Sequence, residues 1–388
     1  MIEPIDKSAF FAAGHFDAVL IIDNSEQNTD LFYLTRFYAP DKFAYIMTPQ
    51  SSVIVTSDLE FERAKKQATV DSVLRINKSA ASSAKNNKVP LFIQTLIDFF
   101  NENKIKNILV PDNMPVKYAD IIRGNGFCVN YKDAPFVPQR SIKTDAEIEC
   151  IARAVETTES VVERAIDLIA TTKIDGDYLK LNGEMFTSEK LKRFIEGELF
   201  KLGYISKNTI VAGGLQTYDP HNRGTGPLPA NKPIILDVFP RSEETFYYAD
   251  MTRTVVRGTP QIEVIKMFEA VKEAQQSACI AIKHGVTARE VHSEVCRIFT
   301  ESGFSTGMID GYMQGFIHST GHGLGLDIHE EPRIYDADQQ LIAGQVVTVE
   351  PGLYYKNFGG VRIEDVVVVQ KNGALNLNKL EKKLIFAD

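Results

Sequence analysis

Three of the seven histidines fall within twelve residues, in a stretch that is also rich in glycine: His318-Ser-Thr-Gly-His322-Gly-Leu-Gly-Leu-Asp-Ile-His329. Imidazoles bind metals and carry protons near neutral pH, and they are rarely clustered for packing. Glycines lack a Cβ, so they let the backbone come close to an ion or a ligand. The run predicts a metal site or a proton-transfer site, and it lies between acidic positions that could complete a metal site.

The length and charge of the chain limit what it can be. A chain of 388 residues is too long to fold around a single compact core, so two domains are expected. The net charge is −8 and there is no long run of lysine or arginine, which argues against nucleic acid and anionic membrane as partners. No apolar run has transmembrane length, and residues 1–7 lack the pattern of a signal peptide.

The cysteines indicate a reducing compartment. Cys128, Cys150, Cys279 and Cys296 are scattered and show no CxxC spacing. This pattern favours buried thiols over a disulfide framework. We therefore expect a cytoplasmic protein.

Residues 1–139 are expected to form a small α/β domain. Short apolar runs predict strands at 18–22, 43–47, 53–56 and 107–111. Helices are expected near 59–68 and ending at 121–126. The segment 133–140 contains two prolines and is expected to connect this domain to the rest of the chain.

Residues 140–388 are expected to form an α+β domain, with helices packed on a mostly antiparallel sheet. Two capping boxes, Thr144 with Glu147 and Thr287 with Glu290, predict the starts of two helices. Another helix is expected at 187–202, and a further one can open at Pro260. The apolar side of this last helix would carry Ile262, Ile265, Phe268, Val271 and Ile282.

Two β-hairpins are expected in the same domain. One would pair 234–239 with 246–256, and the other would pair 346–355 with 361–369. Each hairpin carries two carboxylates: Asp237 and Asp250, then Glu350 and Glu364.

These four carboxylates predict a metal site if both hairpins turn them inward. Alternation along a strand places Thr252 on the side of Asp250, and Arg362 on the side of Glu364. Acids inside buried strands are costly unless they are paired or bound to a cation. Four converging anions would be neutralised by two divalent cations, and His322 would complete the site.

The expected donor set is rich in oxygen and has one nitrogen. Such a set suits Mn²⁺, Co²⁺ or Fe²⁺, and Zn²⁺ less exclusively. Two ions about 3.5–4 Å apart can activate a bridging water and polarise a carbonyl group.

Taken singly, each residue has an ordinary explanation. Asp237 or Asp250 could be a turn residue or a salt-bridge partner, Glu364 could pair with Arg362 at the surface, and His221 could be an exposed histidine. Together with the histidine cluster, the metal site is favoured. Other sites do not fit: the chain has no dinucleotide loop before a helix, no P-loop, no Gly-x-Ser-x-Gly elbow and no zinc-protease helix.

At these residues the chain resembles the pita-bread metallopeptidases, specifically the branch of aminopeptidase P and prolidase. The resemblance runs from about residue 140 to the end, and 28–35 is similar to the family's N-terminal domain. Its motifs are Asp237, Asp250-Met-Thr-Arg-Thr, the 318–329 run, Thr348-Val-Glu350-Pro-Gly-Leu-Tyr354 and Gly360-Val-Arg362-Ile-Glu364-Asp. It implies a creatinase-like α/β domain at 1–139 and a pita-bread catalytic domain at 140–388.

The resemblance also implies roles for individual residues. The ligands of two divalent ions, with Mn²⁺ foremost, would be Asp237, Asp250, His322, Glu350 and Glu364. Glu350 would also handle the proton of the attacking water. Substrate binding and stabilisation of the tetrahedral intermediate would fall to His221, His318 and His329, with Arg362, Tyr354 and Thr252 as supports for substrate and ligands.

The implied reaction is the hydrolysis of an Xaa-Pro bond, at the N-terminus of a peptide or in a dipeptide, by a metal-bridging hydroxide. The implied substrates are peptides with proline at the second position, and the implied assembly is a homodimer. Sequence alone leaves open whether the chain is a dipeptidase or an aminopeptidase.

The chain departs from the family in three respects. Asp237-Val-Phe239 stands where the family has Asp-x-Gly, the gap from Asp237 to Asp250 is slightly long, and 171–187 resembles an insertion between two helices. Two alternatives share the fold: a metal-free creatinase-type amidinohydrolase and a non-catalytic binding module. Both tend to lose ligand residues, whereas all five ligand positions are filled here.

Overall fold

The computed structural model describes residues 7–11, 15–77 and 89–386. Residues 1–6, part of the segment expected to lack a signal peptide, lie outside this range. The chain divides into two units, 1–140 and 141–388. The sequence placed Arg140 first in the second domain. It belongs to the first unit here because its Nη1 donates to Thr29 Oγ1 at 2.8 Å and to Asp30 Oδ1 at 2.7 Å.

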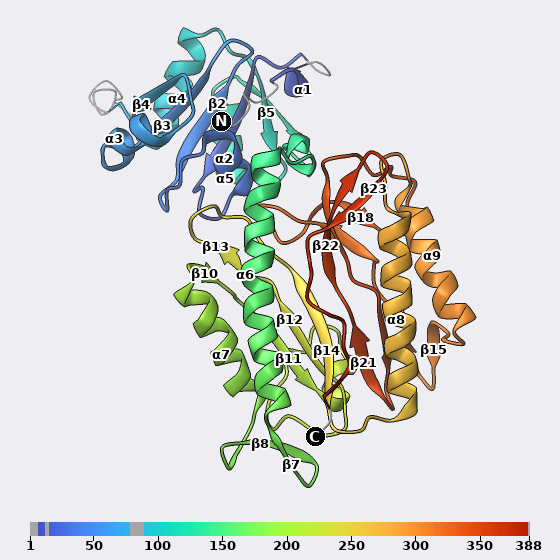
Figure 1. Cartoon of the computed structure of the whole chain (residues 1–388). Coiled ribbons are helices and arrows are strands. Elements are labelled where there is room, and N and C mark those ends of the chain that lie inside the picture. The colour runs from blue at the N-terminus through green and yellow to red at the C-terminus, as the bar shows by residue number, and fades with distance from the viewer. Residues whose placement is uncertain (1–6, 12–14, 78–88, 387–388) are drawn as a thin grey trace. The chain divides into compact units, whose positions relative to one another are not determined.

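The first unit is built on a six-stranded mixed sheet in the order β4-β3-β2-β1-β5-β6 (Figure 1). Its strands are β1 Ala18–Asp23, β2 Phe43–Met47, β3 Ser52–Thr56, β4 Ser72–Arg75, β5 Asn107–Pro111 and β6 Cys128–Lys132. Its helices are α1 Ser8–Phe11, α2 Thr29–Thr35, α3 Asp58–Gln67, α4 Leu91–Glu102 and α5 Val116–Gly124.

Both faces of this sheet are buried. Along β1, Leu20 and Ile22 belong to one hydrophobic cluster, while Val19 and Ile21 belong to another. A strand buried on both sides needs apolar residues at every position, which explains the continuous runs in the sequence. The expected α/β domain and its strands are therefore confirmed.

The second unit has two layers of helices around its strands (Figure 1). The helices are α6 Asp145–Ala170, α7 Ser188–Lys201, α8 Ile262–Ala281 and α9 Ala288–Glu301. One apolar core joins α6 and α7 to β11, β12 and β14, and another joins α8 and α9 to β19–β22. Both expected capping boxes are present, at the starts of α6 and α9.

The main strands of the second unit form a four-stranded sheet, β11-β12-β14-β24, and a five-stranded sheet, β18-β17-β19-β22-β23. Pairing is antiparallel except between β14 and β24, so the expected α+β class is confirmed. Their bounds are β11 Ile210–Gly213, β12 Ile234–Val238, β14 Met251–Arg257, β17 Gly321–Gly323, β18 Glu330–Ile334, β19 Val346–Val349, β22 Asp365–Gln370, β23 Gly373–Asn376 and β24 Ile385–Phe386.

Short strands complete the unit. The expected insertion 171–187 contributes a three-stranded sheet of its own. The short strands are β7 Lys173–Asp175, β8 Tyr178–Leu181, β9 Glu184–Met185, β10 Tyr204–Ile205, β13 Arg241–Ser242, β15 Gly307–Ile309, β16 Tyr312–Gln314, β20 Gly352–Tyr355 and β21 Gly359–Arg362. Two 3-10 helices, η2 Pro138–Ser141 and η3 Gly214–Tyr218, lie in the connections.

The two expected hairpins need correction. The first is real, but its second strand begins at Met251, because residues 246–250 make only an isolated bridge, between Tyr248 and Arg241. The second is two separate ladders: β20 pairs with β21, and β19 pairs with β22. Pro351, which has no N–H to donate, interrupts the first of the two expected strands.

The helix expected to open at Pro260 also needs correction. It begins at Ile262 after the N-cap residue Gln261, and Ile262 is 56% exposed instead of facing the core. The buried side is formed by Val264, Met267, Phe268, Val271 and Ala274. Across the described ranges, none of the helices has both the length and the apolar character to cross a lipid bilayer.

Candidate metal centre

One cavity of about 430 Å³ gathers all the predicted histidines and carboxylates. Its volume lies in the range of small-molecule sites. Its polar lining comprises His221, Asp237, Asp250, His318, Ser319, His322, His329, Arg333, Glu350, Arg362 and Glu364. The remaining predicted residues, Thr252 and Tyr354, lie behind this lining, where they bind Glu364 and His318 respectively.

The acids are placed by the ends of paired strands. Asp237 in β12 lies opposite Thr252 in β14, and the backbone N–H of Glu364 donates to the Thr252 carbonyl at 3.1 Å. Glu350 follows β19 and Glu364 precedes β22, so both lie where the β19–β22 ladder stops. The break in the ladder frees these two side chains to turn into the cavity.

Three of the predicted ligands form a tight cluster. Donor atoms of Asp250, His322 and Glu364 all lie within 4.8 Å of one another. His322 Nε2 is 3.7 Å from Asp250 Oδ2 and 3.6 Å from Glu350 Oε1. Asp250 Oδ1 is buried and has no hydrogen-bond partner among the described residues. An orphaned carboxylate oxygen in such a cluster is the feature that a bound cation would explain.

The tautomer of His322 suits a metal ligand. Its Nδ1 lies 3.1 Å from the carbonyl oxygen of Gly323, which can only accept, so Nδ1 carries the proton. Nε2, which faces Asp250 and Glu350, is left with its lone pair. Burial and the neighbouring His329 lower the pKa of His322 to about 4, so the ring is neutral at pH 7.

In the absence of a cation, the negative charge of each carboxylate makes it harder for the neighbouring carboxyl groups to lose their protons. Burial, then the charges of Glu364, Asp237 and Glu350, raise the pKa of Asp250 well above its usual range. Burial and the charges of Glu350 and Asp237 raise that of Glu364 as well. Burial, with a further contribution from Asp237, raises the pKa of Glu350 to about 8. Divalent cations would relieve this repulsion, so the donor set fits them.

A hydrogen-bonded chain supports one side of the cluster. Arg362 Nη2 lies 2.7 Å from Asp237 Oδ2, and Arg362 Nη1 donates to the Tyr354 hydroxyl at 2.9 Å. The Tyr354 hydroxyl lies 2.9 Å from His318 Nε2. Because His318 Nδ1 faces the Ser319 carbonyl at 2.8 Å, Nδ1 carries the proton and Nε2 accepts from Tyr354.

In the 318–329 run, the absence of a Cβ on glycine allows close packing of neighbouring strands more than close approach of a ligand. A Cβ on Gly321 would overlap the carbonyl oxygen of Thr348 in β19. The sequence suggested close approach to an ion, but at this position the close approach is to a neighbouring strand. The absent Cβ lets β17 lie against β19 and so places His322 in the cavity.

The cavity also contains residues that were not predicted as site residues. Arg333 lies opposite His322 across the β17–β18 pair, and no described residue forms a hydrogen bond or ion pair with its guanidinium. Apolar side chains line the remainder: Ile210, Pro220, Phe239, Ile317 and Ile328. The departure at Phe239 was visible in the sequence, whereas the register that places Arg333 was not.

The chain matches Metallopeptidase family M24 over residues 149–371, the stretch that contains the whole donor set. The chain belongs to this family. The Xaa-Pro dipeptidase of Pyrococcus horikoshii is 29% identical to this M24 metallopeptidase over 397 residues, covering 99% of this chain and 97% of that protein.

Solved structures of an Xaa-Pro dipeptidase and an X-Pro aminopeptidase are similar over nearly the whole chain. The Xaa-Pro dipeptidase from Bacillus anthracis has a TM-score of 0.81 at 25% identity and covers 97% of both chains. The X-Pro aminopeptidase from Thermotoga maritima has a TM-score of 0.79 at 26% identity, covering 96% of this chain and 98% of that one. The resemblance to pita-bread metallopeptidases, the fold class and the assignment as an enzyme are thereby confirmed.

Proposed function

We propose that this M24 metallopeptidase is a dinuclear exopeptidase that hydrolyses the Xaa-Pro bond, with Xaa-Pro dipeptides as its preferred substrates. The observation that carries the metal chemistry is the cluster of Asp250, His322 and Glu364 with its orphaned oxygen. The names of the relatives, Xaa-Pro dipeptidase and X-Pro aminopeptidase, support the choice of bond.

Two divalent ions would be held by the predicted ligands. An oxygen-rich set with one imidazole favours Mn²⁺, with Co²⁺, Fe²⁺ or Zn²⁺ as alternatives. When bound, such ions activate water and polarise the carbonyl of the scissile bond. The ligands would be Asp237, Asp250, His322, Glu350 and Glu364.

Side chains that line the cavity would transfer protons and stabilise the negative charge that develops on the substrate. A Glu350 carboxylate oxygen, which lines the cavity, would take the proton from the attacking water. His329 and His221 are exposed at the cavity lining, and with His318 they would stabilise the oxyanion of the tetrahedral intermediate.

The lining of the cavity suits an Xaa-Pro dipeptide. A proline imide has no N–H to donate, so its ring can lie against apolar side chains without leaving a donor unsatisfied. Phe239, Ile317 and Ile328 offer such a surface. Arg333 has no partner among the described residues and lies beside His322, so its guanidinium can pair with the free carboxylate of a dipeptide.

The test uses chelator-treated protein reloaded with Mn²⁺ or Co²⁺. We expect metal-dependent cleavage of Xaa-Pro, weaker cleavage of Xaa-Pro amide and of Xaa-Pro-Yaa, and none of Xaa-Ala. Replacing Arg333 by Ala should lower kcat/KM for Xaa-Pro roughly 10- to 100-fold, the value of a hydrogen bond to a charged group. The same variant should leave cleavage of Xaa-Pro amide unchanged, because the amide has no carboxylate to lose.

Arg333→Lys is the matched control, since it keeps the charge and should retain part of the preference for a free carboxylate. Equal losses of kcat/KM on the dipeptide and on its amide would reject the dipeptidase assignment. If the metal-loaded protein cleaved no proline peptide at all, the proline assignment would be rejected. All four cysteines are free, but Cys128 is exposed and the other three are only partly buried, so the expected burial of the thiols is wrong. The proposed cytoplasmic location favours such free thiols. That location and the homodimer stay predictions.

A further inference from the structure

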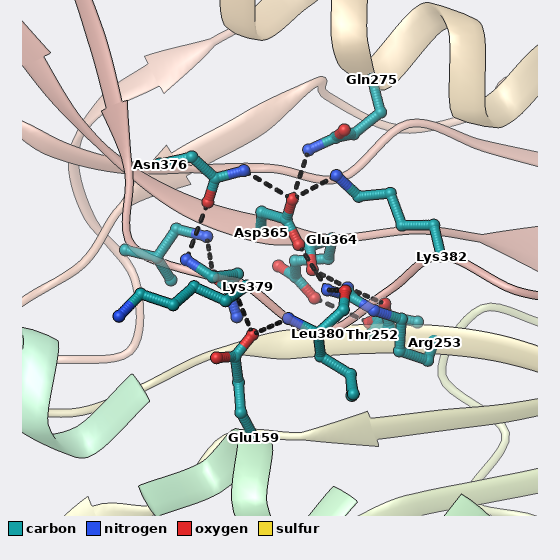
Figure 2. A network of polar contacts seen from close by, with 12 residues as sticks. Glu159, Thr252, Arg253, Gln275, Glu364, Asp365, Asn376, Lys379, Leu380 and Lys382 are labelled. Atoms are coloured by element: carbon teal, nitrogen blue, oxygen red, sulfur yellow. Dashed lines mark hydrogen bonds and ion pairs between the residues drawn. The ribbon is translucent and has the colours of Figure 1, made fainter. Parts of the chain in front are cut away.

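Arg253 and Asp365 directly follow two residues of the site, and their side chains point to the side of the sheet that faces away from the metal centre. Thr252 and Glu364 meet in front, where Thr252 Oγ1 donates to Glu364 Oε2 at 2.7 Å. The following residues, Arg253 and Asp365, meet behind, with 2.8 Å between Arg253 Nη2 and Asp365 Oδ1. This arrangement follows from the two-residue alternation of a strand, and Figure 2 shows both pairs.

The rear pair holds the backbone of the front pair. Arg253 Nη1 donates to the carbonyl oxygen of Thr252 at 2.9 Å and to that of Glu364 at 2.8 Å. Arg253 Nη1 therefore links the backbone at Thr252 to the backbone at Glu364. The side chain of Glu364 belongs to the metal cluster, and the side chain of Thr252 supports it. A shift of this guanidinium would move the Glu364 carboxylate relative to Asp250 and His322.

The C-terminal segment 377–386, which we name the strap, reaches this rear pair. Lys382 Nζ lies 2.6 Å from Asp365 Oδ2, and the Leu380 carbonyl accepts from Arg253 Nη2 at 3.0 Å. At one end, the backbone N–H groups of Lys379 and Leu380 donate to Glu159 Oε1 at 2.7 and 2.8 Å (Figure 2). At the other end, β24 pairs with β14.

Asp365 has more partners than charge balance requires. Its side chain is 1% exposed, and Arg253 alone would neutralise it. It also accepts from Gln275 Nε2 at 3.0 Å and from Asn376 Nδ2 at 2.8 Å, and Lys382 adds a second cation. With one donor on Oδ1 and three on Oδ2, the carboxylate has little freedom to rotate, and neither has the guanidinium that it holds.

We propose that the strap is a positioning element of the metal centre, with Lys382 as its positioning residue. Lys382 orients Asp365, Asp365 orients Arg253, and Arg253 fixes the backbone that presents Glu364 to the ions. The inference rests on the metal-binding part of the proposed function. It does not depend on which peptide is cleaved.

The test compares Lys382→Met with Lys379→Met in the full-length protein. Methionine keeps most of the aliphatic stem and removes the charge. Lys379 belongs to the same strap, but its side chain is exposed. Mn²⁺ is titrated into chelator-treated protein by calorimetry, and the urea unfolding midpoint of the metal-free protein is measured alongside. kcat and KM for an Xaa-Pro dipeptide are then measured at saturating Mn²⁺.

We expect Lys382→Met to weaken at least one Mn²⁺ affinity about tenfold, the low end of the effect of residues that orient ligands. Its kcat should fall with KM nearly unchanged, while its unfolding midpoint stays close to that of the wild type because Arg253 still neutralises Asp365. Lys382→Arg should recover most of the affinity, and Lys379→Met should match the wild type in every measurement.

A second variant keeps the test decisive if Lys382→Met does not fold. Glu159→Ala removes the acceptor of the Lys379 and Leu380 N–H groups, which loosens the strap at this end, and should lower the Mn²⁺ affinity in the same direction by a smaller factor. Mn²⁺ affinities that stay within twofold of the wild type in the folded variants would overturn the proposal. So would equal losses of affinity in Lys382→Met and Lys379→Met. Absence of Xaa-Pro cleavage by the wild type with a normal Mn²⁺ titration would overturn only the proline assignment.

Discussion

Arg362 and Asp237 form a buried ion pair, in which Nη2 lies 2.7 Å from Oδ2 and the two side chains are 4% and 12% exposed. The pair places a fixed positive charge inside a group of carboxylates. Because the same guanidinium donates to Tyr354, it also fixes the orientation of the Asp237 carboxylate. A proposed metal ligand is thus held in place by a residue that cannot itself bind a cation.

The first prediction concerns this charge. Arg362→Met should lower the free energy of unfolding of the metal-free protein by about 3–5 kcal/mol, because it leaves Asp237 buried and unpaired beside other acids. Urea unfolding measures the loss. Saturating Mn²⁺ should restore more stability in this variant than in the wild type, since ions replace the missing charge. A loss that Mn²⁺ does not reduce would contradict the electrostatic explanation.

The second prediction concerns Glu350. Glu350→Gln should remove an ion ligand and the group that accepts the proton of the attacking water, so kcat for an Xaa-Pro dipeptide should fall at least about 1,000-fold. The fold should survive, because burial raises the pKa of Glu350 to about 8, so its side chain is already mostly neutral at pH 7 in the metal-free site and the amide resembles that form. Full activity in a correctly folded variant, judged by circular dichroism, would refute the assigned role.

Local patterns in the sequence predicted much of the fold. The capping boxes at Thr144 and Thr287 depend on residues three positions apart, and both are present. Strand β1 was predicted because a strand buried on both sides is apolar throughout. The break after β19 was missed, although Pro351 within the expected strand was a signal against a continuous ladder.

Long-range pairing explains what the sequence did not predict. The donor residues could be named because their types and spacing resemble a known family. Arg333 reaches the cavity through a register with His322 that shifts at a β-bulge, and no local pattern specifies such a shift. Likewise, Lys382 meets Asp365 because the strap runs back to β14, with which β24 pairs, and no local pattern specifies this return.

The third prediction concerns removal of the ions. Chelation should lower the thermal midpoint, and Mn²⁺ should raise it, since an ion that binds only the folded state stabilises it. The gain is about 2.7 kcal/mol for each site at one hundred times its dissociation constant. Differential scanning calorimetry across a Mn²⁺ series measures it. Asp250→Asn should blunt the response, because it replaces the orphaned oxygen donor of the cluster. An unchanged midpoint would argue against metal binding at this cluster.

The last prediction concerns pH. Burial, followed by the charge of Arg362, lowers the pKa of His318 to about 3, against about 6.5 in the unfolded chain. Between these values the unfolded state binds a proton that the folded state does not, so His318 stabilises the fold fully above pH 6.5 and loses this contribution as the pH falls towards 3.

His318→Gln removes this titration and keeps a polar side chain beside Tyr354. The difference in free energy of unfolding between wild type and variant should therefore be constant above pH 6.5. Below pH 6.5 it should shrink by up to about 1.4 kcal/mol per pH unit, the slope that one proton produces. Carboxylates shared by both proteins titrate in the same range, so only this difference isolates the imidazole. A difference that stays flat from pH 7.5 to 4.5 would mean that His318 takes up its proton in the folded protein, and the chain from Arg362 through Tyr354 to a neutral His318 would then be wrong.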